Sequence, residues 1–199
     1  MIRTPLALIP YLIAAALVAA GLLWHASDSL SGMSRVVSQG EALIGGPFIL
    51  IGQDGKVRRA TDFRDRFMLV YFGYSYCPDV CPTTLAVMAD ALEKLGPKAA
   101  RVVPIFITID PERDTSGVLK TYLKGFGPRF VGLTGDAKAI AAAAHAYRVY
   151  YRKRPLKGGG YAMDHSSHIY LMGRDGKFIA SYDETFGPDE LAEALKKQL

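Results

Sequence analysis

The sequence predicts an α/β domain that follows an N-terminal membrane-spanning helix. Two continuous apolar runs, at 67–72 and 102–109, are typical of buried central strands. Segments with helical spacing alternate with these and with shorter strand-like runs, and the chain ends in a hairpin and a helix. Ahead of all of them, no residue from Pro5 to Trp24 carries a charge.

The N-terminal run is about long enough to cross the hydrocarbon core as a helix, which needs roughly 20 residues. Arg3 precedes it, so the positive-inside rule keeps that end in the cytoplasm. We therefore expect residues 1–24 to be a single-pass anchor in a bacterial inner membrane, with the rest facing the periplasm. A cleaved secretory signal is the alternative, because Val18–Gly21 contains small residues that suit a peptidase. The length of the run favours the retained anchor.

The exported part reads as a linker and one domain. Residues 25–40 are rich in Ser and Gly without apolar periodicity, which predicts a linker. Residues 41–199 then form one domain, long enough to bury about two thirds of the unfolded chain's surface. The net charge of +5 is scattered, with no basic stripe interleaved with aromatic residues, so nucleic acid is not an expected partner.

The first half of the domain shows four elements. Apolar alternation, turn residues and helical spacing predict a strand at 48–51, its return strand at 56–58, the buried strand at 67–72 and a helix at 83–95. Gly96-Pro97 stops that helix.

The second half continues the alternation. Pro104 is an objection to the first half of the strand at 102–109. The patterns then predict a helix at 116–126, strands at 130–133 and 147–152, a helix at 136–147 capped by Asp136, a hairpin of 168–172 with 177–182, and a helix at 189–197 after Pro188.

The cysteines of the chain, Cys77 and Cys81, lie between the first buried strand and its helix, each followed by proline. A dithiol loop in that position is typical of a thioredoxin-like fold. A disulfide closing so short a loop would stabilise the fold little, which favours chemistry over a structural role. Pro82 predicts a helix with Cys81 at its N-cap, where the helix dipole stabilises a thiolate.

Paired thiolates select soft metals, and Cu(I) is the soft metal expected outside the cytoplasm. Two thiolates leave such an ion undersaturated, so we expect a third ligand from elsewhere. His165 opens a strand that faces the dithiol in a thioredoxin-like fold, although a lone histidine is often structural. Asp164 could orient it or cap the turn. His25, His145 and His168 are expected to be interfacial, packing and surface residues, respectively.

Three separated segments resemble the Sco/SenC family over about residues 44–199. They are Cys77–Pro82 (CPDVCP), Thr108–Thr115 (TIDPERDT), and Asp164–Ser166 together with Tyr170–Leu171. The resemblance implies a membrane-anchored thioredoxin-like protein that binds copper, as Cu(I) or Cu(II), and assists assembly of the binuclear copper centre of cytochrome c oxidase.

The same resemblance implies that Cys77, Cys81 and His165 are the copper ligands. It implies that the copper-site subunit of the oxidase is the partner, that another copper chaperone can be the donor, and that the thiols can reduce the partner's cysteines. Asp79 and Asp110 match family positions. We interpret Asp79 as a polar residue of the loop and Asp110 as part of a turn at the end of a strand. Met163 is interpreted as filling a gap in the core, with a soft metal ligand as the alternative.

The basic segment at 152–160 precedes His165. One hypothesis is a mobile hairpin tip that carries His165 towards the dithiol and contacts the partner. The alternative is a solvated tip without a role.

Three functions are compatible with this site. The first is a copper metallochaperone, and the second is a thiol–disulfide reductase acting on the copper-site cysteines of an exported partner. The third is a peroxidase of the peroxiredoxin type, which needs an activating Thr that residues 73–76 do not provide at the required spacing.

Overall fold

The computed structural model describes residues 36–39 and 44–199, all within one compact unit, Val36–Leu199. The predicted anchor at 1–24 and most of the predicted linker lie outside the described residues. Among the helices that the structure does describe, none combines the length and the apolar character needed to span a bilayer.

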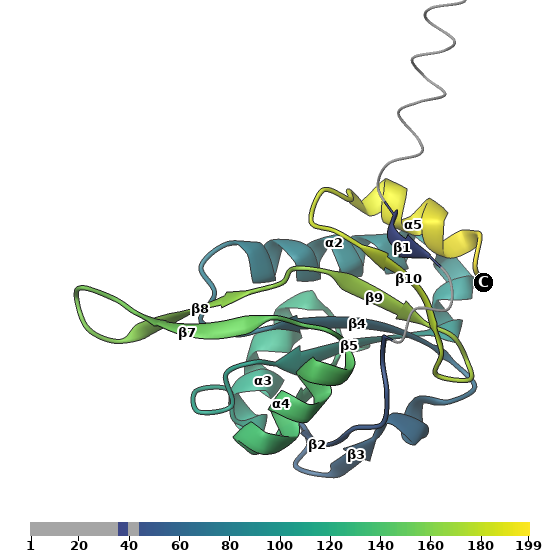
Figure 1. Ribbon diagram of the computed structural model, residues 1–199. Coiled ribbons are helices and arrows are strands. Elements are labelled where there is room, and N and C mark those ends of the chain that lie inside the picture. The colour runs from purple at the N-terminus through teal and green to yellow at the C-terminus, as the bar shows by residue number, and fades with distance from the viewer. Residues whose placement is uncertain (1–35, 40–43) are drawn as a thin grey trace, which may run out of the picture. The chain divides into compact units, whose positions relative to one another are not determined.

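An eight-stranded mixed sheet forms the centre of this unit, in the order β1-β10-β9-β4-β5-β6-β2-β3 (Figure 1). Its strands are β1 Val36–Gln39, β2 Ile49–Gly52, β3 Val57–Arg59, β4 Phe67–Gly73, β5 Val102–Thr108, β6 Val131–Thr134, β9 Ile169–Met172 and β10 Phe178–Tyr182. The predicted buried strands are confirmed as β4 and β5, which run parallel and bury every residue. They are the hydrophobic centre of the core, as continuous apolar runs require.

Pro104 lies in β5 opposite Leu69 of β4. The other neighbour, β6, pairs with β5 only from Ile105 onward. The first half of β5 therefore has one partner strand, and proline is tolerated where one side of a strand needs no backbone donor.

β1 extends the sheet by pairing antiparallel with β10. It falls inside the range 25–40 that the sequence analysis interpreted as linker, so the described domain starts at Val36 rather than at residue 41. Two consecutive valines at 36 and 37 suit a strand, although the surrounding Ser and Gly residues conceal the pattern.

Helices cover both faces of the sheet. They are α2 Val80–Lys94, α3 Ser116–Leu123, α4 Ala137–Ala146 and α5 Pro188–Lys196. α2 and α5 pack side by side (Figure 1). Tyr71 of β4 contacts Phe106, which in turn contacts Tyr122 of α3, while the next residue, Phe72, contacts Tyr147 after α4 on the opposite face. This layered α/β arrangement is the predicted thioredoxin-like fold.

Most predicted helix ends and turns are confirmed. Asp136 caps α4 by accepting the N–H of Ala139 at 2.7 Å, and Pro188 begins α5. The predicted strand at 147–152 is wrong in its first half, because Arg148 has φ +58° and the chain turns there. The strand begins instead at Tyr151.

The start of α2 also differs from the prediction. The helix begins at Val80 with Asp79 in the N-cap position, so Cys81 is its second residue rather than its N-cap. Pro82 is then the third residue, and it is accommodated because N–H groups of the first turn have no partner within the helix.

A separate two-stranded sheet holds β7 (Tyr151–Pro155) and β8 (Tyr161–His165), which pair antiparallel. This hairpin projects from the body of the domain as a long arm (Figure 1). Its basic side chains Arg152, Lys153 and Arg154 are exposed, and His165 ends β8 at the base of the arm.

Candidate metal centre

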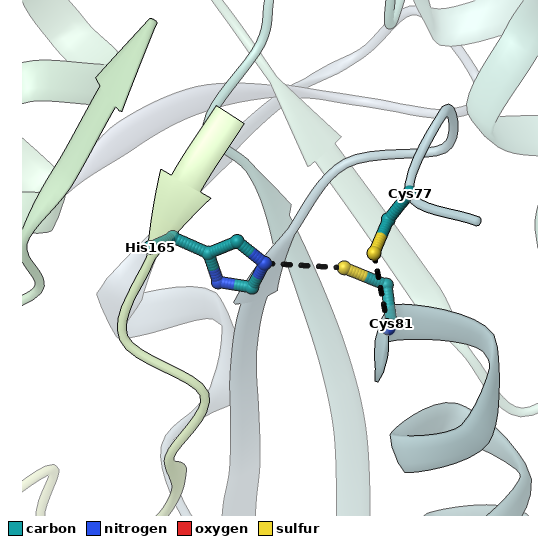
Figure 2. A group of neighbouring side chains, drawn as sticks. All are labelled: Cys77, Cys81 and His165. Carbon is teal, nitrogen blue, oxygen red and sulfur yellow. Dashed lines mark hydrogen bonds between the residues drawn. The ribbon is translucent and has the colours of Figure 1, made fainter. Parts of the chain in front are cut away.

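Three side chains from two distant parts of the chain meet at one end of the central sheet (Figure 2). Cys77 comes from the loop after β4, Cys81 from the first turn of α2, and His165 from the end of β8. Their sulfur and ring nitrogen atoms all lie within 4.8 Å of one another, and the Cys81 Sγ lies 3.4 Å from the His165 Nε2. Among the described residues, this is the one cluster that offers such a set of ligand atoms.

Gly73 at the end of β4 makes room for the buried sulfur. A Cβ at this position would lie 2.9 Å from the Cys81 Sγ and 3.0 Å from the Phe106 ring. The sulfur therefore rests directly against the end of the strand backbone, where a larger residue would displace it.

The two cysteines have different surroundings. Cys77 is half-buried and Cys81 is fully buried, and both are free thiols. The hydrogen bond from Cys81 is the main cause that lowers the pKa of Cys77 to about 3, against the opposing effect of burial. The backbone N–H groups of Asp79 and Cys81 lower it further. The hydrogen bond to Cys77, followed by burial, raises the pKa of Cys81. The thiolate predicted at Cys81 is therefore found at Cys77 instead.

His165 is oriented by its own chain. Its Nδ1 lies 2.9 Å from the carbonyl oxygen of Ser166, so that nitrogen carries the proton and donates it. The Nε2 lone pair is then directed at Cys81, and the rings of Tyr71 and Tyr74 approach the imidazole edge-on. A backbone carbonyl thus supplies the orienting partner that metal-binding histidines usually have.

One expectation was that Asp164 orients the His165 ring, but in the structure its carboxylate has other partners. Its carboxylate pairs with Arg152 and Arg154 across the hairpin, at 3.3 and 3.0 Å. Neighbouring residues on a strand point to opposite faces, which separates Asp164 from His165.

The other histidines that the structure describes are not part of this cluster. His168 contacts the ring of Tyr170. His145 is exposed in the last turn of α4, so the packing role expected for it is wrong. Met163 is buried, as expected of a core gap-filler. His25 lies outside the described residues.

The hypothesis of a mobile tip started from the need to bring His165 to the dithiol. In the structure the ring is already within hydrogen-bond distance of Cys81. Its approach to the sulfurs therefore requires no movement of the hairpin.

Of the residues behind this site, Asp110 was expected only to form a strand-end turn, and no separate role was expected for Arg113 or Asp114. Asp110 and Asp114 follow β5 and are almost completely buried, and Arg113 lies between tyrosine rings beside them. The signal was present, because four ionisable residues at 110 and 112–114 closely follow a fully buried strand, and any of them that are buried need partners inside the fold.

Comparison with known proteins identifies relatives along most of the chain. A family model described as SCO1/SenC matches residues 36–199. The mitochondrial SCO1 homolog 1 of Arabidopsis thaliana is 39% identical over 163 residues, which are 81% of this chain and 49% of the relative. An SCO2-like protein of Rickettsia felis is 40% identical over 157 residues, covering 77% of this chain and 76% of that protein.

Solved structures show the same fold. ScoI of Bradyrhizobium japonicum with copper bound is 46% identical with a TM-score of 0.73, covering 78% of this chain and 99% of that one. Arabidopsis thaliana ScoI with copper bound is 39% identical with a TM-score of 0.75, covering 78% and 97%. BsSco, a member of the Sco family of cytochrome c oxidase assembly proteins, is 26% identical with a TM-score of 0.64, covering 82% and 96%.

The chain spans about half the length of the Arabidopsis SCO1 homolog, whereas it covers nearly all of the solved Sco domains. The match to the family model includes the dithiol loop, the segment after β5 and the histidine strand. The chain therefore belongs to the SCO1/SenC family.

Proposed function

We propose that this protein binds one copper ion as cargo through Cys77, Cys81 and His165, and delivers it to the copper-site subunit of cytochrome c oxidase. The observation that carries the proposal is the convergence of two sulfurs and one imidazole nitrogen within 4.8 Å. Relatives with the same fold have been solved with copper bound, which supports the choice of metal.

The chemistry of these three donors fits copper. Thiolate and imidazole are ligands that suit copper, and soft thiolates favour Cu(I) in particular. Cys77 is already a thiolate at neutral pH because its pKa is about 3. Cys81 must release its proton when the metal binds, so loading is expected to release protons. The Nε2 atom of His165 has its lone pair free for the metal while Nδ1 donates to Ser166.

Delivery requires that a partner reach the cargo. Cys77 is half-buried, and the neighbouring Tyr76 is 64% exposed. A partner's ligands can therefore replace those of this chain one at a time, starting from the Cys77 side. Another copper chaperone would load the site from the same side.

The anchor completes this proposal. Residues 1–24 would hold the domain at the periplasmic face of a bacterial inner membrane, where an oxidase copper site is assembled. Support comes from the uncharged run between Pro5 and Trp24 and from Arg3 before it.

Copper titration of the full-length chain tests the proposal, with Cu(I) measured against a competing chelator and Cu(II) followed by its spectrum. We expect one equivalent to bind. Cys77→Ser and Cys81→Ser should each weaken binding by more than about 100-fold, since even residues behind metal ligands are worth about 10–100-fold.

His165→Ala should weaken binding by roughly 10–100-fold and change the Cu(II) spectrum. His168→Ala is the matched control, because it removes a nearby imidazole that lies outside the cluster, and it should bind as the wild type does. Normal binding in both cysteine variants would refute the assignment.

A second function, reduction of the partner's copper-site cysteines, is favoured by the contrast between the two thiols. Cys77 is accessible and ionised, so its thiolate can attack a partner disulfide. The attack forms a mixed disulfide with Cys77 and releases the first partner sulfur as a thiolate. The Cys81 thiol then loses its proton, attacks the Cys77 sulfur and releases the second partner thiolate. This chain ends with a Cys77–Cys81 disulfide, and the partner gains two electrons and becomes two thiols, with one proton from Cys81 and one from solvent. His165→Ala should retain this reduction while copper binding weakens, and equal loss of both would exclude an independent reductase activity.

A further inference from the structure

The segment from Thr108 to Asp114, which follows β5, contains buried carboxylates that belong to no ligand set. Asp114 is 0% exposed and Asp110 is 2% exposed. Burying a carboxylate is costly unless hydrogen bonds and opposite charges satisfy it. Both are satisfied, and their partners lie on the two elements that carry the sulfur and imidazole ligands.

Asp114 holds the dithiol loop. Its carboxylate accepts hydrogen bonds from the backbone N–H of Ser75, at 2.9 Å, and from the Ser75 hydroxyl. Thr108 donates to the same carboxylate at 2.7 Å. Ser75 is two residues before Cys77, so this contact defines where the loop leaves β4.

Asp110 holds the histidine hairpin. Its carboxylate accepts a hydrogen bond from the Tyr161 hydroxyl at 2.8 Å. Tyr161 and His165 lie four residues apart on β8, and side chains at even spacing share one face of a strand. The hydrogen bond that holds Tyr161 therefore also holds the face of β8 on which His165 lies.

Arg113 joins the two sides. Its guanidinium lies 3.8 Å from the ring centre of Tyr161 on the hairpin and 4.7 Å from that of Tyr76 on the dithiol loop. It also donates to the Tyr161 carbonyl at 3.1 Å and pairs with Asp110. A planar cation between two aromatic rings contacts both elements at once.

Side-chain contacts carry particular weight here because β7 and β8 pair with each other and with no strand of the main sheet. The backbone ladder of the central sheet holds β9 from Ile169 onward, but it does not include β8, the strand on which His165 lies. The outer face of the hairpin has its own ion pairs, between Asp164 and the arginines, which do not reach the body of the domain.

We propose that residues Thr108–Asp114 form a bracket that positions both halves of the metal site, the dithiol loop through Asp114 and Ser75 and the His165 hairpin through Asp110, Arg113 and Tyr161. This inference rests on the proposed copper function. Its residues are positioning residues, since none contributes an atom to the ligand cluster. A site held in place before the metal arrives loses less entropy on binding.

Two conservative variants test separately the contact of the bracket with the hairpin and its contact with the dithiol loop. Tyr161→Phe removes only the hydroxyl that binds Asp110 and keeps the ring against Arg113. Ser75→Ala removes only the hydroxyl that binds Asp114. Arg154→Gln is the matched control, because it breaks an ion pair on the outer face of the same hairpin without touching the bracket. Thermal unfolding of each full-length variant verifies that it folds.

The first readout needs no copper. Hydrogen exchange of the backbone amides of 161–165 should be roughly tenfold faster in Tyr161→Phe, since a hydrogen bond to a charged group is lost. It should be unchanged in Ser75→Ala and in Arg154→Gln. Unchanged exchange in folded Tyr161→Phe would refute the proposal that the bracket holds the hairpin.

The second readout is Cu(I) affinity in two backgrounds. Tyr161→Phe should weaken binding roughly tenfold in the wild type and leave it unchanged when His165→Ala is already present, because it acts through that imidazole. Ser75→Ala should weaken binding in both backgrounds, because it acts through the dithiol. Equal losses from Tyr161→Phe in both backgrounds, or no loss in either, would overturn the bracket. A wild type that binds no copper would refute the proposed function instead, and the exchange measurement would still decide the bracket.

Discussion

Cys77 and Cys81 carry the same functional group and titrate in opposite directions. The hydrogen bond from Cys81 lowers the pKa of Cys77 to about 3, while the same hydrogen bond and burial raise the pKa of Cys81. The one proton of the pair therefore stays on the buried sulfur of Cys81, and the accessible sulfur of Cys77 is ionised. This arrangement makes Cys77 the first thiolate available both to a metal ion and to a partner disulfide.

The reactivity of Cys77 should therefore be nearly independent of pH. An ordinary thiol has a pKa of about 8.5, so at pH values below this its alkylation rate rises about tenfold for each pH unit. Because the pKa of Cys77 is about 3, its thiolate persists and its alkylation rate should stay flat between about pH 5 and pH 8. Stopped-flow alkylation of the reduced Cys81→Ser and wild-type chains measures this.

In Cys81→Ser the main hydrogen bond to the Cys77 sulfur changes, so the rate should regain part of its pH dependence. A wild-type alkylation rate that rises throughout this pH range, as for an ordinary thiol, would contradict the assignment of an ionised Cys77 beside a protonated Cys81.

At the scale of elements, the N-terminus of α2 depends on the dithiol loop. Asp79 occupies the N-cap position without a side-chain hydrogen bond to the helix. The backbone N–H of Cys81, in the first turn, points instead at the Cys77 sulfur, 3.4 Å away. The first N–H groups of a helix need outside acceptors, and the positive end of the helix dipole favours an anion there. The Cys77 sulfur, proposed as a copper ligand, is therefore also the acceptor at the start of α2.

This double role predicts a difference between two variants that both lose copper. Cys77→Ser keeps an oxygen acceptor for the Cys81 N–H, whereas Cys77→Ala removes the acceptor. We expect Cys77→Ala to lower the free energy of unfolding of the copper-free protein by about 0.5–2 kcal/mol relative to Cys77→Ser, as for other lost caps. Denaturant unfolding under reducing conditions gives the two values, and equal stabilities would show that the sulfur does not cap α2.

At the scale of the whole molecule, the sheet brings together residues that are 84 positions apart in sequence, Cys81 and His165. β4 delivers the dithiol loop at its carboxyl end, and β9, which follows His165, pairs antiparallel with β4. The histidine strand therefore ends beside the loop. The same topology places the segment after β5 next to both, because β5 runs parallel to β4.

The proposed orientation in the membrane is testable with the native cysteines, since the chain contains two, both in the domain. A membrane-impermeant thiol reagent should label the half-buried Cys77 of the reduced full-length chain in intact spheroplasts. A chain without residues 1–24, made in the cytoplasm, should be labelled only after lysis. Labelling of the full-length chain only after lysis would place the domain on the cytoplasmic side.

Much of the fold was predictable because β4 and β5 are continuous apolar runs and the helices have clear boundaries at Asp136 and Pro188. Errors came where local rules compete. Pro82 suggested a later start for α2, but a proline is tolerated anywhere in a first turn. Arg148 adopts a left-handed backbone that its residue type does not announce, so the turn before β7 was missed.

The sequence by itself determined the kind of chemistry, because Cys77 and Cys81 lie only four positions apart in the chain and need no fold to be recognised as a pair. Only the tertiary structure decided how His165 is oriented, which thiol is ionised and what holds the site together. Those properties depend on contacts of Ser166, Asp110 and Asp114 with distant residues or with the backbone. Spacing in a sequence carries no information on such contacts, because hydrogen-bond partners and burial are set by the packing of the whole sheet.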